Sequence, residues 1–334
     1  MCAEHDRYQQ VLDFFGPRAQ RHAPLAAYTS ARVGGPADVL LTVRDPRELA
    51  LAARHLWNWG LPFWVLGGGS NVLIADQGVR GVVVLNRARQ ATFHTAGETP
   101  TLWAASGANL GSLARRAAQQ GLAGLEWAVG IPGTVGGAVV GNAGAHGRDT
   151  AAALQLAEIL HKEEGRHRYT PQDLGMAYRT SRLKTRPQQA VVLSATFRLQ
   201  KDKPQDVQAR LEAFNEQRKR TQPPGASMGS MFKNPPGDYA GRLIEAAGLK
   251  GATVGDAEIS TVHANFFLNK GQATAQHIWA LMYLARTTVA QKFGVWLEPE
   301  IQLLGAWPPE AVYALYEEEN LPPITPLPRP KEAA

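Results

Sequence analysis

Two glycine-rich clusters constrain the fold of this chain more than any other feature of its sequence. The first, VLGGGSNVL, spans residues 65–73 and directly follows a predicted strand; the second spans residues 130–147 and begins with GIPGTVGG. Glycine allows the main chain to approach a ligand closely and to adopt positive φ angles. We therefore expect two ligand-binding loops, the second with little regular structure, although a tight turn is the alternative for each cluster.

The first cluster is suited to an anion. Successive backbone N–H groups in such a turn form a concave anion site, and Ser70 and Asn71 can add side-chain donors. A pyrophosphate fits that description. Neither cluster is a Rossmann fingerprint, because those glycines open a helix and an acidic ribose partner follows about twenty residues later. The clusters therefore predict a phosphate-bearing ligand without identifying the nucleotide.

The rest of the chain predicts alternating helices and strands. Asp45 and Pro46 mark the start of a helix that stops at Gly60. Further helices are expected near 110–117, 207–214, 239–247 and 273–293, and strands at 37–43, 61–66, 81–85, 100–105, 190–199, 262–269 and 295–304. A chain of 334 residues accommodates two or three substructures. The predicted division is an N-terminal segment (1–19), a first unit (20–85), a second unit (86–218), a third unit (219–305) and a tail (306–334) that is Pro-rich and extended from Pro322.

Composition excludes several classes of protein. No stretch offers the roughly 18 uninterrupted apolar residues of a membrane span, and the N-terminus lacks the apolar region of a secretion signal, so we expect a cytoplasmic protein. The one cysteine, Cys2, excludes an internal disulfide and cysteine-based metal clusters. The nine histidines show no metal-binding spacing, so no metal site is predicted.

The formal net charge of +6 suits an anionic partner. Nucleic acid is one candidate, but the sequence has no basic stripe with interleaved aromatic residues and no recognisable nucleic-acid module. A small polyanion such as a diphosphate, bound by a few arginines, is the preferred interpretation. A positive charge that serves solubility alone is the alternative.

Six motifs occur in the order seen in one enzyme family. They are GGGSN, GIPGTVGG followed by NAGAHG, MAYRTS (176–181), GSMFKNP (229–235), HANFFLN (263–269) and LEPEI (297–301). Over roughly residues 28–305 the chain thus resembles the UDP-N-acetylenolpyruvoylglucosamine reductase (MurB) family of peptidoglycan synthesis. The resemblance implies an α+β fold: a two-subdomain FAD-binding fold of the vanillyl-alcohol oxidase / p-cresol methylhydroxylase (PCMH) type, over about 28–200, plus a C-terminal α+β substrate-binding subdomain.

The resemblance also implies an activity. NADPH would reduce a non-covalently bound FAD, and the flavin would pass hydride to the enolpyruvyl ether of UDP-N-acetylenolpyruvoylglucosamine, giving UDP-N-acetylmuramate. Such an enzyme is expected to be monomeric and to bind neither nucleic acid nor membrane. The chain has no long insertion after Arg179, so it resembles the shorter subtype without a tyrosine-bearing flap.

Three residues are catalytic candidates on the family pattern. Ser230 would donate a proton to the substrate carbon, and Arg179 would stabilise the growing charge on the carboxylate. Strand alternation places Glu298 and Glu300 on the same face and does not choose between them. The family pattern selects Glu300, as a hydrogen-bond donor when protonated or as a group that orients a neighbouring donor when ionised.

The remaining candidates bind cofactor or substrate. FAD would be held by Gly67, Gly68, Gly69, Ser70, Asn71, Gly130, Ile131, Pro132, Gly133, Thr134, Gly136, Gly137, Asn142 and Gly144. Substrate would be held by Lys233, Asn234, Arg218, Tyr178 and His263. Arg220 competes with Arg218, and His263 is equally compatible with a structural role. His146 and Gln302 depart from the family pattern, in which Tyr and Arg occupy these positions.

Two other functions remain compatible with the sequence. A flavin oxidase of the same fold would use oxygen and often a covalently linked flavin, although no attachment motif is present. A basic protein that binds nucleotides or RNA without catalysis would also explain the positive charge and the glycine loops.

Overall fold

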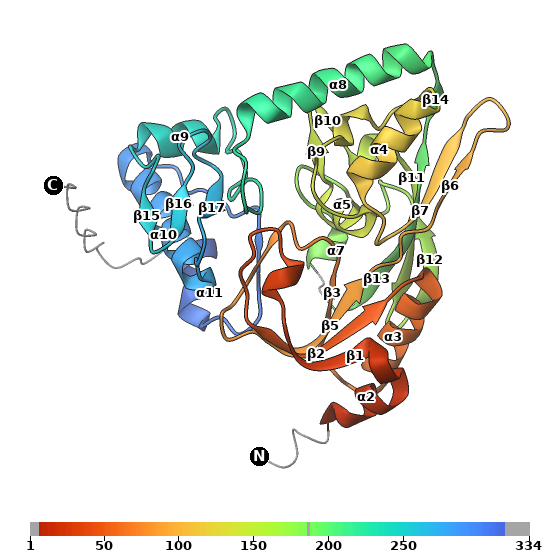
Figure 1. Ribbon diagram of the computed structural model, residues 1–334, viewed down its shortest axis with the longest axis horizontal. Helices are drawn as coiled ribbons and strands as arrows, with labels where there is room; N and C mark the ends of the chain where they lie inside the picture. Colours follow the sequence, from red (N-terminus) through yellow and green to blue (C-terminus); the bar gives the residue numbers. More distant parts are fainter. Residues whose placement is uncertain (1–6, 186–187, 318–334) are drawn as a thin grey trace.

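The structure is a computed structural model, and it describes residues 7–185 and 188–317. Three groups of elements follow one another along the chain, each built around its own sheet (Figure 1). The N-terminal group is red to orange in Figure 1, the middle group yellow to green, and the C-terminal group turquoise to blue. The long helix α8 (Pro204–Thr221) runs from the middle group toward the C-terminal group.

The first sheet is four-stranded, with the order β1-β2-β5-β3. Its strands are β1 (Ala19–Pro24), β2 (Pro36–Val43), β5 (Val79–Asn86) and β3 (Phe63–Leu66). The predicted first helix is confirmed as α3 (Pro46–Asn58), and Asp45 caps it by accepting hydrogen bonds from the N–H groups of Arg47 and Glu48. Four apolar residues at helical spacing on α3 are fully buried, together with residues of α2 (Gln9–Phe15).

The second sheet is antiparallel and five-stranded, with the order β12-β11-β13-β7-β6. Its strands are β12 (Gly165–Tyr169), β11 (Leu154–His161), β13 (Ala190–Arg198), β7 (Thr101–Ala105) and β6 (Ala91–His94). Helices α4 (Leu110–Gln119) and α5 (Val135–Gly141) contribute to its core. Short elements complete this part: β8 (Leu122–Ala123), β14 (Gln200–Lys201), β9 (Gly144–Ala145), β10 (Arg148–Asp149), α6 (Thr150–Ala153) and α7 (Arg182–Thr185). Three 3₁₀ turns are η1 (Gly16–Arg18), η2 (Ala26–Tyr28) and η3 (Glu126–Ala128).

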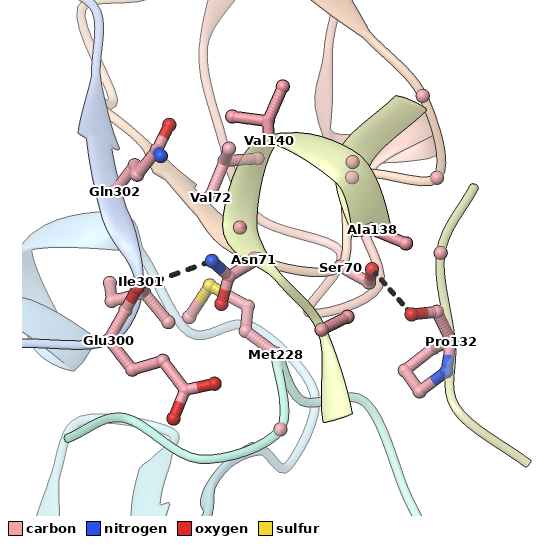
Figure 2. Close-up of a pocket in the computed structure, with 18 of the residues that line it drawn as sticks. Ser70, Asn71, Val72, Pro132, Ala138, Val140, Met228, Glu300, Ile301 and Gln302 are labelled. Atoms are coloured by element: carbon pink, nitrogen blue, oxygen red, sulfur yellow. Dashed lines mark hydrogen bonds between the residues drawn. The ribbon is translucent and has the colours of Figure 1, made fainter. Parts of the chain in front are cut away.

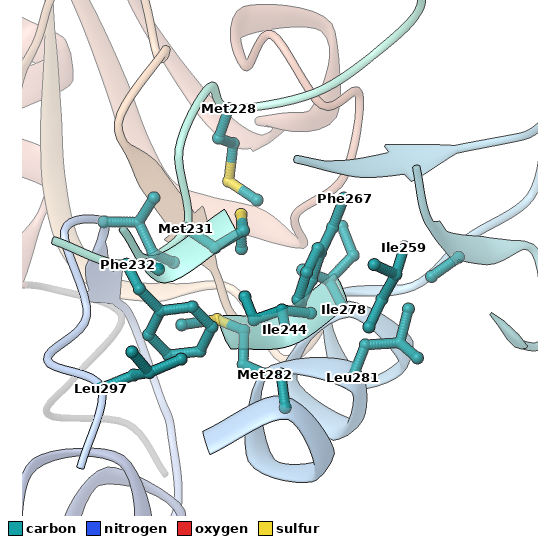
Figure 3. Close-up of a cluster of buried hydrophobic side chains, with 14 of the residues drawn as sticks. Met228, Met231, Phe232, Ile244, Ile259, Phe267, Ile278, Leu281, Met282 and Leu297 are labelled. Atoms are coloured by element: carbon teal, nitrogen blue, oxygen red, sulfur yellow. The ribbon is translucent and has the colours of Figure 1, made fainter. Parts of the chain in front are cut away.

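The C-terminal group packs helices against a three-stranded sheet. The strands are β15 (Thr253–Val254), β16 (Ala257–Ile259) and β17 (Phe267–Asn269), and the helices are α9 (Ala240–Ala246), α10 (Ala275–Phe293) and α11 (Pro309–Tyr316). Figure 3 shows its core, in which Met231 and Phe232 pack among residues of these elements. The apolar half of the GSMFKNP motif is therefore anchored in this core, and Phe232 serves packing.

A strand pair and a helix cap are among the contacts that fasten the C-terminal group to the first. Strand β4 (Val72–Ile74), which follows the first glycine cluster, pairs in parallel with β18 (Gln302–Leu304). Asp76, just after β4, accepts hydrogen bonds from the N–H groups of Ala275 and Gln276 at 2.8 and 3.0 Å. Since those groups begin α10 and have no partner within the helix, Asp76 caps a helix about 200 residues further along the chain.

Three local predictions were wrong. The strand expected at 262–269 is reduced to β17, because Ser260 Oγ accepts hydrogen bonds from two following N–H groups and turns the chain. The strand expected at 295–304 is regular only in β18; before it, single contacts with the GSMFKNP segment replace a ladder. The second glycine cluster contains helix α5 over 135–141, because packing against the second sheet outweighs the weak helix propensity of glycine.

Part of the predicted tail, for which no secondary structure was predicted, is helical. Residues 309–316 form α11, whose Leu315 is fully buried in the C-terminal core. The extended segment expected from Pro322 lies outside the described residues. Within 7–185 and 188–317 no helix is long and apolar enough to cross a membrane, and no group of metal-binding side chains occurs.

Candidate active site

A cavity of about 1210 Å³ is lined by residues of all three groups, and it includes both glycine clusters. Figure 2 shows one part of it: the loop carrying Ser70 and Asn71, the segment carrying Glu300 to Gln302, and the turn carrying Met228. Ser230, Arg179 and Glu300 all line this cavity. The structure thus brings together three residues that are separated by 51 or more positions in the chain.

The first glycine cluster forms a tight loop between β3 and β4. Gly69 has a φ of +59°, and a Cβ atom there would lie 2.1 Å from the Tyr28 carbonyl oxygen, so no larger residue fits. Among the described residues, the backbone N–H groups of Gly68, Gly69 and Ser70 have no hydrogen-bond partner in the protein. Unpaired backbone donors beside a cavity are suited to an anionic oxygen.

The two glycine clusters touch each other. Ser70 Oγ donates a hydrogen bond to the Pro132 carbonyl oxygen at 3.1 Å, as the dashed line in Figure 2 shows. A Cβ atom at Gly67 would lie 2.3 Å from Thr134 Oγ1, so the absence of a side chain permits this approach. Thirteen of the fourteen residues predicted to bind FAD line the cavity: Gly67, Gly68, Gly69, Ser70, Asn71, Gly130, Ile131, Pro132, Gly133, Thr134, Gly136, Gly137 and Gly144.

Asn142 is the predicted FAD-binding residue that the structure places elsewhere. It is buried at the end of α5 in the left-handed conformation, with a φ of +43°. Its side-chain amide donates to Asp149 Oδ2 and to the Ala177 carbonyl oxygen, and its side-chain oxygen accepts the Ala151 N–H. Since these bonds use both its donor group and its acceptor, Asn142 terminates the helix and supports the Ala177 turn.

Arg179 and Glu300 form an ion pair at the edge of the cavity. Arg179 Nε lies 2.9 Å from Glu300 Oε1, and the two side chains are 24% and 15% exposed. The Nε–H bond is not directed at that oxygen, so Nε is buried without a hydrogen-bond acceptor. Burial raises the pKa of the Glu300 carboxyl group, and the positive charges of Arg179, Lys184 and Lys233 oppose that rise.

Arg179 occupies an unfavourable backbone conformation. Its φ is +56°, in a tight turn that is closed by the reciprocal backbone hydrogen bonds of Ala177 and Thr180. A left-handed conformation costs a residue with a Cβ atom about 1–2 kcal/mol, and such strain is concentrated at functional sites. The turn also places the guanidinium group 5.8 Å from the centre of the Tyr178 ring.

Ser230 is held between buried neighbours. Met228 and Met231 on either side are 2% and 0% exposed, and Ser230 itself pairs with Phe266 in an isolated antiparallel bridge. Its hydroxyl group makes no hydrogen bond to any described residue, although it lines the cavity. The backbone is therefore fixed while the hydroxyl group stays available to a ligand. Ser227 lines the same cavity, so position alone does not separate the two serines.

The predicted substrate residues divide into two sets. Lys233 and Arg218 line the cavity: Lys233 Nζ donates to Glu298 Oε1 at 2.5 Å, and Arg218 donates to the Gln222 side chain at 2.7 Å. Asn234 and Tyr178 lie outside the lining but join two groups of elements, because the Asn234 N–H donates to the Tyr178 hydroxyl oxygen at 3.3 Å. Asn234 Oδ1 also accepts the Ala240 N–H at the start of α9.

Three other residues singled out in the sequence are also placed. His263 lies outside the cavity lining, packs edge-on against the ring of Phe266 and accepts the Asn265 N–H, which fits a structural role. His146 stacks on Phe214 at 4.3 Å and likewise does not line the cavity, whereas Gln302 does. Arg220, the competitor of Arg218, is exposed and outside the lining.

Sequence reasoning missed Lys184 and Tyr316. Lys184 lines the cavity beside Arg179 and Glu300, and its Nζ donates to the Arg179 carbonyl oxygen at 3.1 Å. Tyr316 also lines the cavity, from α11 in the predicted tail, and its hydroxyl group donates to the Ile301 carbonyl oxygen at 3.2 Å. The sequence offered no signal for Tyr316; for Lys184 the signal was its position five residues after Arg179.

Comparisons with known proteins agree with this arrangement. Residues 37–167 match the FAD binding domain model, and residues 220–304 match the model of the UDP-N-acetylenolpyruvoylglucosamine reductase C-terminal domain. The chain is 48% identical over 284 residues to the UDP-N-acetylenolpyruvoylglucosamine reductase of Chloroflexus aggregans, covering 84% of this chain and 96% of that protein. It is 47% identical to that of Rubrobacter xylanophilus, covering 86% and 96%.

A solved structure is similar over the same region. The crystal structure of the reductase (MurB) from Thermus caldophilus aligns with a TM-score of 0.73 and 38% identity, covering 86% of this chain and 99% of that chain. The predicted α+β fold, with an FAD-binding part followed by a C-terminal part, is thereby confirmed. With relatives of this identity and coverage, the chain belongs to the UDP-N-acetylenolpyruvoylglucosamine reductase family.

Proposed function

We propose that this protein is an NADPH- and FAD-dependent UDP-N-acetylmuramate dehydrogenase, which reduces the enolpyruvyl ether of UDP-N-acetylenolpyruvoylglucosamine in peptidoglycan precursor synthesis. The observation that carries the proposal is the convergence of Ser230, Arg179 and Glu300 on the cavity that the two glycine clusters also line. The named activity of relatives at 48% and 47% identity supports it.

The cavity fits a non-covalent FAD. The unpaired N–H groups of the loop 67–70 are donors for a pyrophosphate, and the facing loop 130–134 offers further backbone at close range. We assign the FAD-binding subdomains to residues 20–85 and 86–218, with the PCMH-type region over about 28–200, and the substrate-binding subdomain to 219–305. FAD bound there would supply the hydride-transfer chemistry that connects NADPH with the substrate.

The residues of the chain supply the proton and the charge stabilisation. The unengaged hydroxyl group of Ser230 donates a proton to the carbon next to the substrate carboxylate. The Arg179 guanidinium group has an unsatisfied N–H and stabilises the negative charge that grows on that carboxylate. Glu300, the partner of Arg179, would donate a hydrogen bond to the same charge when protonated and would orient the Arg179 guanidinium group when ionised.

The sugar nucleotide brings further negative charge. Lys233 and Arg218, which line the cavity, would bind its diphosphate, and Asn234 and Tyr178 shape the rim where the middle and C-terminal groups meet. We further propose that the enzyme is a cytoplasmic monomer with no nucleic-acid partner.

The deciding experiment is NADPH oxidation by the FAD-loaded protein with and without UDP-N-acetylenolpyruvoylglucosamine. Substrate-dependent turnover with formation of UDP-N-acetylmuramate is expected. Oxygen-dependent turnover alone, with the yellow colour retained on the denatured protein, would instead identify a covalent flavin oxidase. A purified protein without flavin absorbance that also fails to bind added FAD would favour a non-enzymatic nucleotide- or RNA-binding protein.

A further inference from the structure

The turn that carries Arg179 is strained, and two side chains outside the turn bond to its backbone: Asn142 to the Ala177 carbonyl oxygen and Lys184 to that of Arg179 itself. Arg179 is a non-glycine residue with a φ of +56°, and only two backbone hydrogen bonds, between Ala177 and Thr180, close the turn itself. Left to itself, a turn with this strain would relax toward conformations that move the guanidinium group. Some additional contact must therefore keep Arg179 directed toward Glu300.

Lys184 makes that contact. It lies on α7, immediately after the turn, and its Nζ donates a hydrogen bond of 3.1 Å to the Arg179 carbonyl oxygen. The base of α7 is itself fixed, because the buried Ser181 donates to the Val140 carbonyl oxygen at 2.7 Å. The Ser181 hydrogen bond thus fixes the start of α7, and the Lys184 side chain reaches from this helix to the strained Arg179 peptide.

The position of the ammonium group fits a charge-assisted bond. Lys184 is half-buried and lines the cavity, where Arg179, Lys233, Glu298 and Glu300 are the charged groups that act on it. Burial and the neighbouring positive charges of Lys233 and Arg179 lower the pKa of the Lys184 amine, and the two carboxylates oppose this. Hydrogen bonds from a cation to a carbonyl oxygen are stronger than neutral ones, so the protonated amine is the better clamp.

We propose that Lys184 is a positioning residue: its ammonium group clamps the Arg179 carbonyl oxygen, holds the strained turn, and so directs the guanidinium group toward Glu300 and the substrate carboxylate. The proposal rests on the proposed function for its kinetic consequence, but the clamp itself is a property of this chain. Because it acts through Arg179, Lys184 influences proton and charge chemistry on the sugar nucleotide and not the reduction of flavin by NADPH.

The kinetic test uses FAD-loaded wild-type protein and the variants Lys184→Met, Lys184→Arg and Arg182→Met. Arg182 is the matched control, since it is an exposed cation on the same short helix and bonds to Asp173 outside the cavity. Stopped-flow absorbance follows flavin reduction by NADPH and then reoxidation by UDP-N-acetylenolpyruvoylglucosamine. We expect Lys184→Met to slow reoxidation about 10- to 100-fold, the effect of a small misplacement, with flavin reduction changed less than about twofold.

The two control variants sharpen the expectation. Lys184→Arg, which keeps a long cationic donor, should recover most of the lost rate and extend activity to higher pH, because an arginine does not lose its proton there. Arg182→Met should behave as wild type. Equal slowing of both half-reactions in Lys184→Met, or loss of FAD from it, would overturn the proposal by showing a general structural role.

A double-mutant cycle separates positioning from direct contact. If Lys184 acts through Arg179, Lys184→Met should change reoxidation less than about threefold when it is added to Arg179→Met. Full additivity would show that Lys184 touches the substrate independently of Arg179, and the positioning role would be wrong.

A measurement without substrate tests the clamp alone. Hydrogen–deuterium exchange of the peptide spanning 176–181 should be at least about tenfold faster in Lys184→Met than in Arg182→Met or wild type, because the turn amides lose their support. Unchanged exchange would overturn the clamp even if the enzyme is fully active. Faster exchange in a protein without reductase turnover would support the clamp and overturn only the proposed function.

Discussion

The Asn71 side chain joins the first glycine cluster to the segment that carries Glu300. Its Nδ2 donates a hydrogen bond to the Glu300 carbonyl oxygen at 3.2 Å (Figure 2). The backbone carbonyl oxygen of Asn71 accepts the Gln302 N–H at 3.0 Å. The loop assigned to the cofactor and the acid assigned to the substrate are therefore positioned by one residue. A substitution in the glycine loop should therefore alter the position of Glu300, and a substitution near Glu300 should alter the loop.

Asn71→Ala tests this connection. Loss of the amide should cost about 1 kcal/mol of unfolding free energy, and it should weaken FAD binding and slow flavin reoxidation together. Urea unfolding, FAD titration and stopped-flow kinetics measure the three effects. Asn269→Ala is the control, because Asn269 also links the first and third groups through a bond to the Ala31 carbonyl oxygen but lies apart from Glu300. Equal kinetic effects of both variants would contradict a specific role for Asn71.

Ser230→Ala should separate the two half-reactions. Proton donation usually contributes about 10²- to 10⁴-fold, so flavin reoxidation by the enolpyruvyl substrate should slow by that factor. Reduction by NADPH should stay nearly unchanged, because the backbone around Ser230 is anchored by Met228 and Met231. Ser227→Ala is the matched control in the same cavity, and it should leave both rates within a few-fold. A larger defect in Ser227→Ala would reassign the proton donor.

Arg218→Met should weaken binding of the sugar nucleotide. A lost charge-assisted hydrogen bond predicts a KM about 10- to 100-fold higher, with a smaller change in the turnover rate. Arg220→Met removes the same charge from an exposed position outside the cavity and should leave the KM unchanged. Initial-rate measurements at several ionic strengths distinguish a direct contact from long-range attraction. A rise in KM that both variants share and that disappears at high salt would indicate only long-range attraction of the substrate.

Glu300 should make stability depend on pH. Burial raises its pKa above the ordinary 4.5, so the native protein retains a proton that the unfolded chain has released. Native stability must then fall as pH rises from about 4.5 through the pKa of the folded state. Glu300→Gln lacks this titration, and its Tm relative to wild type should rise over that range. Glu298→Gln, at a more exposed carboxylate, is the control. Parallel Tm curves for wild type and Glu300→Gln would show that burial does not dominate.

Gly69→Ala should damage the first glycine loop. The added methyl group would overlap the Tyr28 carbonyl oxygen, and the residue would have to keep a φ of +59°. Together, overlap and backbone strain should lower the free energy of unfolding by about 2–4 kcal/mol and weaken FAD binding. Gly97→Ala isolates the backbone term, because its φ is +89° but nothing lies within 4 Å of the new atom. Gly97→Ala should lower the free energy of unfolding by about 1–2 kcal/mol and leave FAD binding intact. Comparable losses in both variants would exclude overlap at Gly69 as the cause.

The sequence by itself determined the elements whose signals are local. The helix at 46–58 needed only Asp45, Pro46 and its apolar spacing, and the strands at 37–43 and 190–199 needed only their β-forming residues. The order of six motifs identified the family and named Ser230, Arg179 and Glu300. The helix and the strands depend on neighbours within a few positions, and the motifs can be recognised in the sequence without knowledge of three-dimensional contacts.

Tertiary structure decided what depends on distant partners. Glycines at 136 and 137 entered a helix because the second sheet packs against α5, and residues near Glu300 formed single contacts with the GSMFKNP segment in place of a strand. Asn142, which we predicted to bind FAD, lies at the end of α5 and bonds to residues up to 35 positions away in the chain. The contact between the Lys184 ammonium group and the Arg179 carbonyl oxygen could be recognised only in the structure. Packing and buried hydrogen bonds join residues that are far apart in the sequence, so no local pattern predicts them, and they fixed the geometry of the site.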